Sequence, residues 1–187
     1  LAGIKYVPCT RVLNNFAVRV VAARGLAPHA AGAERVSVRT EVYHGGAHIA
    51  PSHDTAPVDG PRNASEVVTL SGTDADDFHE FALPVSHVPL GSRVSFTLLS
   101  DVRGPLGWCS VQLYDYKLVL AHGAHTLRLW PGGPANPIGT CVENFTEKQP
   151  VRLYIEFGTH GRADDERVRF VPPTADGDDD DGGGGGG

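Results

Sequence analysis

Lysine is scarce in this chain, and the acidic residues are unevenly spread. Only three lysines occur among 187 residues, and the formal net charge is −6. Residues 171–187 hold five of the 22 acidic residues and no basic residue, which leaves 17 acidic against 16 basic residues elsewhere, a net charge of −1. Because nucleic-acid binding requires clustered lysine and arginine, this balance excludes a nucleic-acid partner.

Cysteine pairs and long apolar runs are also missing. Cys9, Cys109 and Cys141 are far apart without a Cys-x-x-Cys pair, which argues against a structural zinc site or a redox pair. Cys109 alternates with Trp108 in a strand-like run, so we expect it to be a small buried hydrophobe. No apolar run approaches the length of a membrane span, and no secretory signal is present. We therefore expect a reducing, cytoplasmic compartment, and the missing initiator methionine indicates a piece of a longer protein.

The histidines do not have the spacing of a metal site. His44, His48 and His53 fall on one turn and the loop behind it, and His122 and His125 are three positions apart. Zinc needs three or four ligands that converge at about 2 Å, so we interpret these side chains as loop histidines exposed to water. Neither a Gly-x-Ser-x-Gly motif nor a phosphate-binding glycine loop occurs. We predict no catalytic residue, no metal and no cofactor.

Side chains alternate with a period of two residues along much of the chain. In the clearest run, residues 108–114, alternate side chains point to opposite faces of the expected strand. One face carries Trp108, Ser110, Gln112 and Tyr114, and the other carries Cys109, Val111 and Leu113. A second run, 127–131, contains Trp130. We expect these two strands, joined by the small segment 121–124, to form half of a sandwich core. The predicted core residues are Trp108, Trp130, Tyr43 and Leu113.

The whole pattern predicts an all-β fold with eight antiparallel strands packed as a sandwich. We expect strands at 16–23, 36–43, 66–70, 78–85, 93–100, 107–115, 127–130 and 151–157, a short continuation at 47–50 and a proline-rich loop at 51–65. Turn residues separate these runs and no strong helical period appears, as is typical of β-sandwiches. We divide the chain into a lead-in (1–15), one domain (16–158), an exit segment (159–173) and a tail (174–187) whose acidic, glycine-rich composition predicts disorder.

Several short motifs follow one another at characteristic spacings. They are Tyr43-His44-Gly45-Gly46, Phe81-Ala82-Leu83-Pro84, Leu106-Gly107-Trp108, Gln112-Leu113-Tyr114-Asp115-Tyr116, Leu127-Arg128-Leu129-Trp130-Pro131 and Asn136-Pro137-Ile138-Gly139. Together they resemble the C2 domain of phosphoinositide 3-kinases, most closely that of the class I catalytic subunits. The resemblance extends over about residues 12–157. It departs from the family pattern at two places: a glycine replaces the family's usual alanine before Trp108, and loop 51–62 contains Pro51, Pro57 and Pro61, so the resemblance does not carry partner binding over to this loop.

The resemblance implies a C2-type sandwich that is an accessory module of a lipid kinase, whose catalytic domain is absent from this chain. In that family the C2 domain contacts the kinase and helical domains of the same polypeptide, and in class I enzymes the coiled coil of a regulatory subunit. The resemblance places His44, Asp54, Asn144 and Lys148 on loops that face such partners.

Many C2 domains bind calcium through aspartates on two loops at one end of the sandwich. The corresponding loops here are 26–33, which has no carboxylate, and 100–105, which has only Asp101 beside Arg103. Because calcium takes six to eight oxygen ligands, we predict calcium-independent behaviour. Arg103 and Lys117, on loops that we take to be neighbours, are candidate contacts to an anionic or phosphoinositide membrane surface, with His122 adding to them at acidic pH.

The expected function is therefore a non-catalytic, calcium-independent C2 module in phosphoinositide signalling, cytoplasmic and transiently at membranes. It would scaffold the kinase and helical domains and contact a regulatory subunit, a membrane, or both. Two alternatives stay open: a free-standing peripheral membrane phospholipid-binding C2 protein, and an unrelated β-sandwich enzyme or adhesion domain. The sequence distinguishes these only through the family resemblance.

Overall fold

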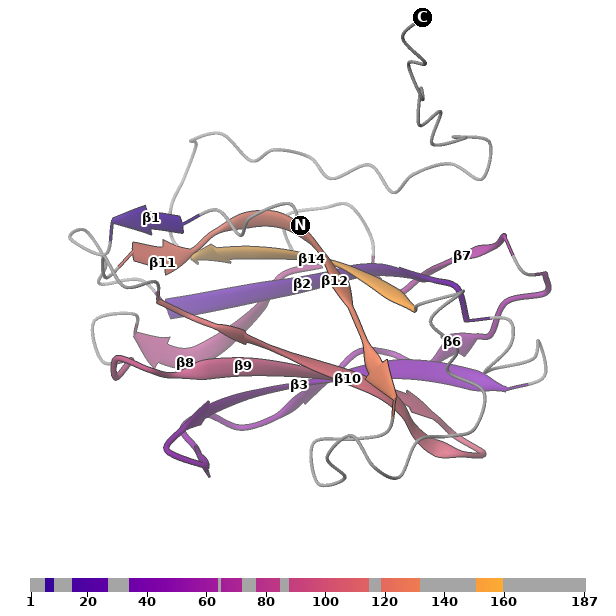
Figure 1. Ribbon diagram of the computed structural model, residues 1–187, viewed down its shortest axis with the longest axis horizontal. Coiled ribbons are helices and arrows are strands. Elements are labelled where there is room, and N and C mark those ends of the chain that lie inside the picture. Colours follow the sequence, from indigo (N-terminus) through magenta and orange to yellow (C-terminus); the bar gives the residue numbers. More distant parts are fainter. Residues whose placement is uncertain are drawn as a thin grey trace, which may run out of the picture.

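The chain folds into two antiparallel β-sheets that lie face to face (Figure 1). The computed structural model describes residues 6–8, 15–26, 34–63, 65–71, 77–84, 88–114, 119–131 and 151–159. These residues form fourteen strands, several of only two or three residues, and contain no α-helix. The prediction of an all-β antiparallel sandwich is confirmed.

The larger layer is a seven-stranded sheet built on three long strands. Its members are β3 (Arg35–His44), β4 (Ala47–His48), β5 (His53–Asp54), β6 (Val58–Asp59), β9 (Arg93–Ser100), β10 (Gly104–Gln112) and β13 (Trp130–Pro131). The order is β13-β10-β9-β3-β4, and β5 and β6 also pair with β3. Gly45 and Gly46 have φ of 56° and 85° and form the two-residue turn from β3 to β4, a conformation that glycine adopts at little cost.

The second layer is a five-stranded sheet around a central, buried strand. Its members are β2 (Asn15–Arg24), β7 (Val67–Thr69), β8 (His79–Pro84), β12 (Gly123–Arg128) and β14 (Arg152–Thr159). The order is β12-β14-β2-β7, and β8 also pairs with β2. Two further strands, β1 (Tyr6–Pro8) and β11 (Val119–Ala121), pair with each other. The apolar run of β2 is buried at eight of its ten positions, as expected of a strand that is covered on both faces.

The core lies between the two sheets and is rich in phenylalanine. Phe16, Phe81 and Phe157 come from the five-stranded sheet, and Phe96 comes from the seven-stranded sheet; all four are at most 1% exposed. The ring centroids of Phe96 and Phe157 are 6.2 Å apart, so this pair joins the layers directly. Truncation of a buried phenylalanine to alanine removes about 3–5 kcal/mol of stability, so this cluster accounts for much of the cohesion of the sandwich.

Some of the expected connections are wrong. Segment 121–124 does not simply link the two tryptophan strands within one half of the core, because it leads into β12 of the five-stranded sheet, and of the second motif only Trp130 and Pro131 form a strand, β13, beside β10. Instead β12 runs from the five-stranded layer toward the other layer, where β13 pairs with β10 (Figure 1). The loop expected at 51–65 contributes β5 and β6, which complete the edge beside β3. The predicted disordered tail, 174–187, lies outside the described residues.

The aromatic residues predicted for the core lie mostly on the outer face of the seven-stranded sheet. Leu113 is fully buried in the core, but Trp130 is 47% exposed and pairs across the strands with the half-buried Trp108. Tyr43 is also half-buried and is not part of the core cluster. The reason is the alternation itself: Cys109 is buried on the inner face of β10, so its neighbour Trp108 must point outward.

Candidate functional site

The loop between β9 and β10 meets the start of β3 at one end of the sandwich. The backbone N–H of Arg35 donates to Oδ1 of Asp101 at 3.0 Å, and the N–H of Asp101 donates to the carbonyl of Arg35 at 3.1 Å. This is the end where the sequence predicted the calcium-type loops. The one aspartate found there from the sequence thus holds the β9–β10 loop against the neighbouring strand.

Glu34 lies beside this loop and binds Arg103. The Arg103 Nη2 atom is 2.6 Å from Oε1 of Glu34, whose side chain is only 11% exposed. The hydroxyl of Ser100 donates to the other carboxylate oxygen at 2.8 Å and accepts the backbone N–H groups of Val102 and Arg103 at 3.2 Å each. Both oxygens of Glu34 are therefore engaged, and a guanidinium carries the positive charge at this end of the sandwich.

Sequence reasoning missed Glu34 because the predicted loop ended one residue earlier. The signal available was the register: Val36 of β3 stands opposite Ser100 of β9, so a residue just before β3 lies near the loop that follows Ser100. In the ranges that the structure describes, no group of three or more histidine, cysteine, aspartate or glutamate side chains converges as a metal site would require. Glu34 and Asp101 instead have arginine and backbone partners.

Of the predicted lipid contacts, the structure places Arg103 and His122, and these two lie far apart. Arg103 precedes β10 at one end of the sandwich. His122 follows Ala121, whose N–H donates to the carbonyl of Leu113 just beyond the other end of β10. The nine residues of β10 separate these positions by roughly 30 Å of extended strand. Nδ1 of His122 is 3.1 Å from the carbonyl oxygen of Phe157, and Lys117 lies outside the described residues.

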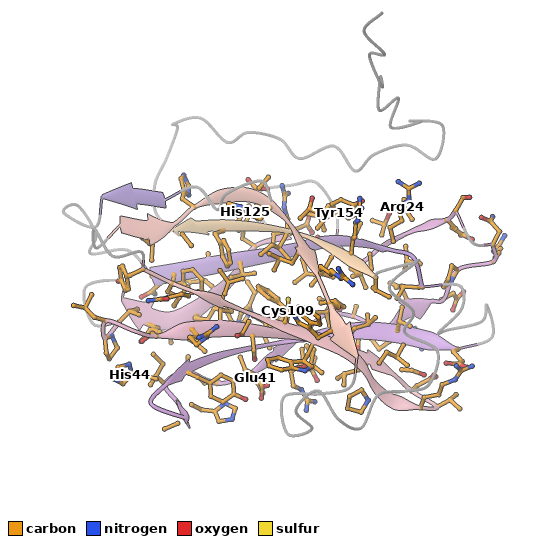
Figure 2. All side chains as sticks on the ribbon, in the orientation of Figure 1. Arg24, Glu41, His44, Cys109, His125 and Tyr154 are labelled. Carbon is orange, nitrogen blue, oxygen red and sulfur yellow. The ribbon has the colours of Figure 1, made fainter. Side chains whose placement is uncertain are left out.

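Two of the four predicted partner-facing residues can be placed. Nδ1 of His44 is 3.4 Å from the hydroxyl oxygen of Ser92 beside the β3–β4 turn. Asp54 receives two hydrogen bonds from Arg39, at 2.8 and 2.7 Å, and these bonds hold the pKa of its carboxyl below its ordinary value. Figure 2 shows His44 at the end of the molecule opposite to Arg24. Asn144 and Lys148 lie outside the described residues.

The interpretation of the histidines as exposed loop residues holds only in part: His44 and His122 are half-buried, and two further histidines pack inside the fold. His125 is 8% exposed, and its Nε2 is 2.9 Å from the carbonyl oxygen of His122. His53 of β5 is half-buried and stacks on His79 of β8, so it joins the edges of the two sheets. His48 fits the interpretation better, since its side chain is 52% exposed and lies against the ring of Tyr43.

Cys109 is the buried hydrophobe that its alternation predicts. It is 6% exposed, and Figure 2 shows it between the two layers. Burial raises the pKa of its thiol to about 12, so the thiolate that nucleophilic chemistry requires is absent at neutral pH. The other two cysteines lie outside the described residues.

Residues 33–159 match the family model described as phosphoinositide 3-kinase C2, which is more than half of the chain. The chain belongs to the phosphoinositide 3-kinase C2 family. The match begins just before Glu34 and ends with β14, so it contains the whole seven-stranded sheet of this C2 domain.

Relatives of this C2 domain are much longer proteins. Phosphatidylinositol 3-kinase 2 of Dictyostelium discoideum is 37% identical over 41% of this chain and 5% of its own length. Phosphatidylinositol 3-kinase 1 of the same organism is 31% identical over 65% of this chain and 9% of its own length. The human phosphatidylinositol 4-phosphate 3-kinase C2 domain-containing subunit beta is 33% identical over 51% of this chain and 6% of its own length. The chain thus spans less than a tenth of each of these relatives. The described residues contain no helix long and apolar enough to cross a membrane.

Proposed function

We propose that this chain is the non-catalytic C2 module of a phosphatidylinositol 3-kinase and scaffolds the kinase and helical domains of that polypeptide without using calcium. The observation that carries the calcium-independent part is the ion pair between Arg103 and Glu34. In a calcium-binding C2 domain several free carboxylates must converge on the ion. Here Glu34 is neutralised by Arg103, and Asp101 accepts the backbone N–H of Arg35.

The same pair favours a scaffold over a membrane anchor. Each free lysine or arginine near an anionic leaflet contributes about 1 kcal/mol to binding. Arg103 must leave Glu34 to make such a contact, and His122 lies at the other end of the sandwich. Direct membrane contact is therefore transient and secondary. Contact with a regulatory subunit would follow the loops that the family uses, including the β3–β4 turn at His44.

Vesicle pelleting tests the calcium-independent part. Vesicles of phosphatidylcholine and phosphatidylserine, with or without a phosphoinositide, are mixed with the chain in calcium or in a chelator. We expect weak pelleting that calcium does not increase. The variant Glu34→Gln should raise pelleting on anionic vesicles because it removes the negative charge beside Arg103, and the double variant Glu34→Gln/Arg103→Gln is the matched control that should return it to the wild-type level. Strong calcium-stimulated pelleting would support the free-standing membrane protein instead.

A binding experiment tests the scaffold. If the chain is part of a lipid kinase, the reading frame beyond residue 187 encodes helical and kinase domains. A fragment with those two domains, expressed separately, should bind this chain saturably. The absence of such domains, or of binding to them, contradicts the scaffolding role and leaves the calcium prediction to be judged by the vesicle experiment alone.

A further inference from the structure

Three arginines stand directly opposite one another at one end of the five-stranded sheet. Arg24 is the last residue of β2, Arg152 is the first residue of β14, and Arg128 is the last residue of β12. The register pairs Arg152 with Arg24 on one side and with Arg128 on the other. Because neighbouring strands lie about 4.8 Å apart, this arginine row spans about 10 Å across three strands.

The arginine row lies on the outer face of the sheet. Leu153 follows Arg152 and is buried in the core, so Arg152 points to the opposite face. Figure 2 shows Arg24 and Tyr154 on that outer side. Arg128 and Arg152 are exposed and Arg24 is half-buried, so the three positive charges are accessible to a partner.

No carboxylate among the described residues forms an ion pair with this row. The three arginines that do form ion pairs each face a carboxylate: Arg19 with Glu156, Arg39 with Asp54, and Arg103 with Glu34. In the row, Arg128 lies over the ring of Trp130, a contact that leaves its positive charge in place. Like charges directly opposite each other on neighbouring strands are destabilising, so an anionic partner would relieve the repulsion within the row.

The chain itself carries a segment of complementary charge. This acidic run comprises Asp176 and residues 178–181, which are all aspartates, and it contains no basic residue. Four consecutive residues of extended chain span about 10 Å, the width of the arginine row. Strand β14 begins in the row at Arg152 and ends at Thr159, roughly 23 Å away. The 19 residues that follow Thr159 up to Asp178 reach at most about 65 Å, so the acidic run can return to the row.

We propose that the acidic run of this chain binds the arginine row, as an intramolecular contact that shields a cationic surface from other anions. Each exposed pair of an arginine and an aspartate is weak and is screened by salt. The tether compensates for this weakness, because a linked segment acts at an effective concentration in the millimolar range. Any other anionic partner of the row has to displace this tethered segment.

NMR of the whole chain tests the contact through the Nε–Hε signals of Arg24 and Arg152 and the amide signals of residues 178–181. Both sets should shift between about 50 mM and about 500 mM salt. A tail-neutral variant, with asparagine in place of all four aspartates at 178–181, should have its arginine signals at the high-salt positions even in low salt. The variant Arg24→Gln/Arg152→Gln should do the same to the amide signals of residues 178–181.

Arg93 provides the matched control. It is an exposed arginine on β9 of the other sheet, and its neighbours across the strands are Tyr43 and Gln112 instead of further arginines. Arg93→Gln should leave the amide signals of residues 178–181 unchanged. An effect equal to that of Arg24→Gln/Arg152→Gln would mean that the acidic run senses only the net charge of the domain, and would overturn the proposal.

A synthetic peptide of residues 174–183 tests whether the row is already occupied. It should bind the tail-neutral variant about fivefold more tightly than the wild type, because the wild-type chain is competent to bind it only while its own acidic run is released. Equal affinities for the two chains, or arginine signals that the tail-neutral variant leaves unchanged, contradict the contact. Shifts that depend on protein concentration assign the row to a second copy of the chain and overturn the intramolecular proposal.

Discussion

Two arginine–carboxylate pairs lie across neighbouring strands, one on the outer face of each sheet. Arg19 of β2 stands opposite Glu156 of β14, and Arg39 of β3 stands opposite Asp54 of β5. The side chains of the first pair are 5% and 4% exposed, whereas those of the second pair are 44% and 43% exposed. The same chemistry is therefore placed in two different environments within one domain.

The environment decides what each pair contributes. A buried pair regains by mutual attraction about what its two charges lose in hydration, but either charge left alone is strongly unfavourable. Water and salt screen an exposed pair, so the loss of either partner matters little. Val21, Ala22 and Tyr154 are buried on the same face as Arg19. The outer face of the five-stranded sheet thus belongs to the stable body of the domain, while that of the seven-stranded sheet is surface.

The largest effect should come from Arg19→Met. Methionine keeps most of the length of the side chain but leaves Glu156 buried without its charged partner, and it also removes the contact of the guanidinium with the ring of Phe78, 4.9 Å away. We expect the free energy of unfolding to fall by about 3–5 kcal/mol, measured by urea denaturation.

The double variant Arg19→Met/Glu156→Leu distinguishes the stability lost with the ion pair from the stability lost because Glu156 stays buried and charged without a partner. It replaces both charges by apolar groups, so most of the lost stability should return. If the single variant loses less than about 1 kcal/mol, Glu156 is solvated like an exposed group, and the distinction between the two faces is wrong.

Much of the fold could be predicted because strands alternate. The buried residues of β3 and β10 follow the period of two along each strand, and the turn at Gly45-Gly46 follows from glycine's access to positive φ. The alternation alone does not say which of the two sets of side chains faces the core. Trp108 and Trp130 suggested the core by their size, but the smaller Cys109 and Leu129 occupy it.

The candidate site was predictable only in part, because its contacts join distant segments. The alternation and motifs located the loop that holds Asp101 and Arg103. The partner of Arg103 is Glu34, 69 positions earlier, and only the register of β3 on β9 brings the two together. His53 is similar: its stacking partner His79 comes from the other sheet, and no local pattern pairs them.

A smaller effect should follow from Trp130→Ala, on the exposed face. The guanidinium carbon of Arg128 lies 5.4 Å from the centre of the Trp130 ring, a cation–π contact that contributes about 0.5–1 kcal/mol at an exposed site. We expect a loss of about 1 kcal/mol in the free energy of unfolding, measured by denaturation with tyrosine and Trp108 fluorescence as the probe. A loss of about 3–5 kcal/mol, as for a buried tryptophan, would mean that the Trp130 side chain is buried and that this face of the sheet is covered.

The smallest effect should come from Asp54→Asn, which leaves the shape of the Arg39 pair but removes the negative charge. At neutral pH and low salt we expect a loss of about 0.2–1 kcal/mol, and about 1 M salt should shrink it. Because the hydrogen bonds from Arg39 lower the pKa of Asp54 from 3.8, the stabilisation by this carboxylate is complete above that ordinary value and disappears as the pH falls through the lowered one. The wild type and the variant should therefore differ near pH 7 and converge in acid. A difference that persists in acid, or that salt does not reduce, means that the pair acts through packing, and the contrast with Arg19 and Glu156 would then rest on shape instead of on charge.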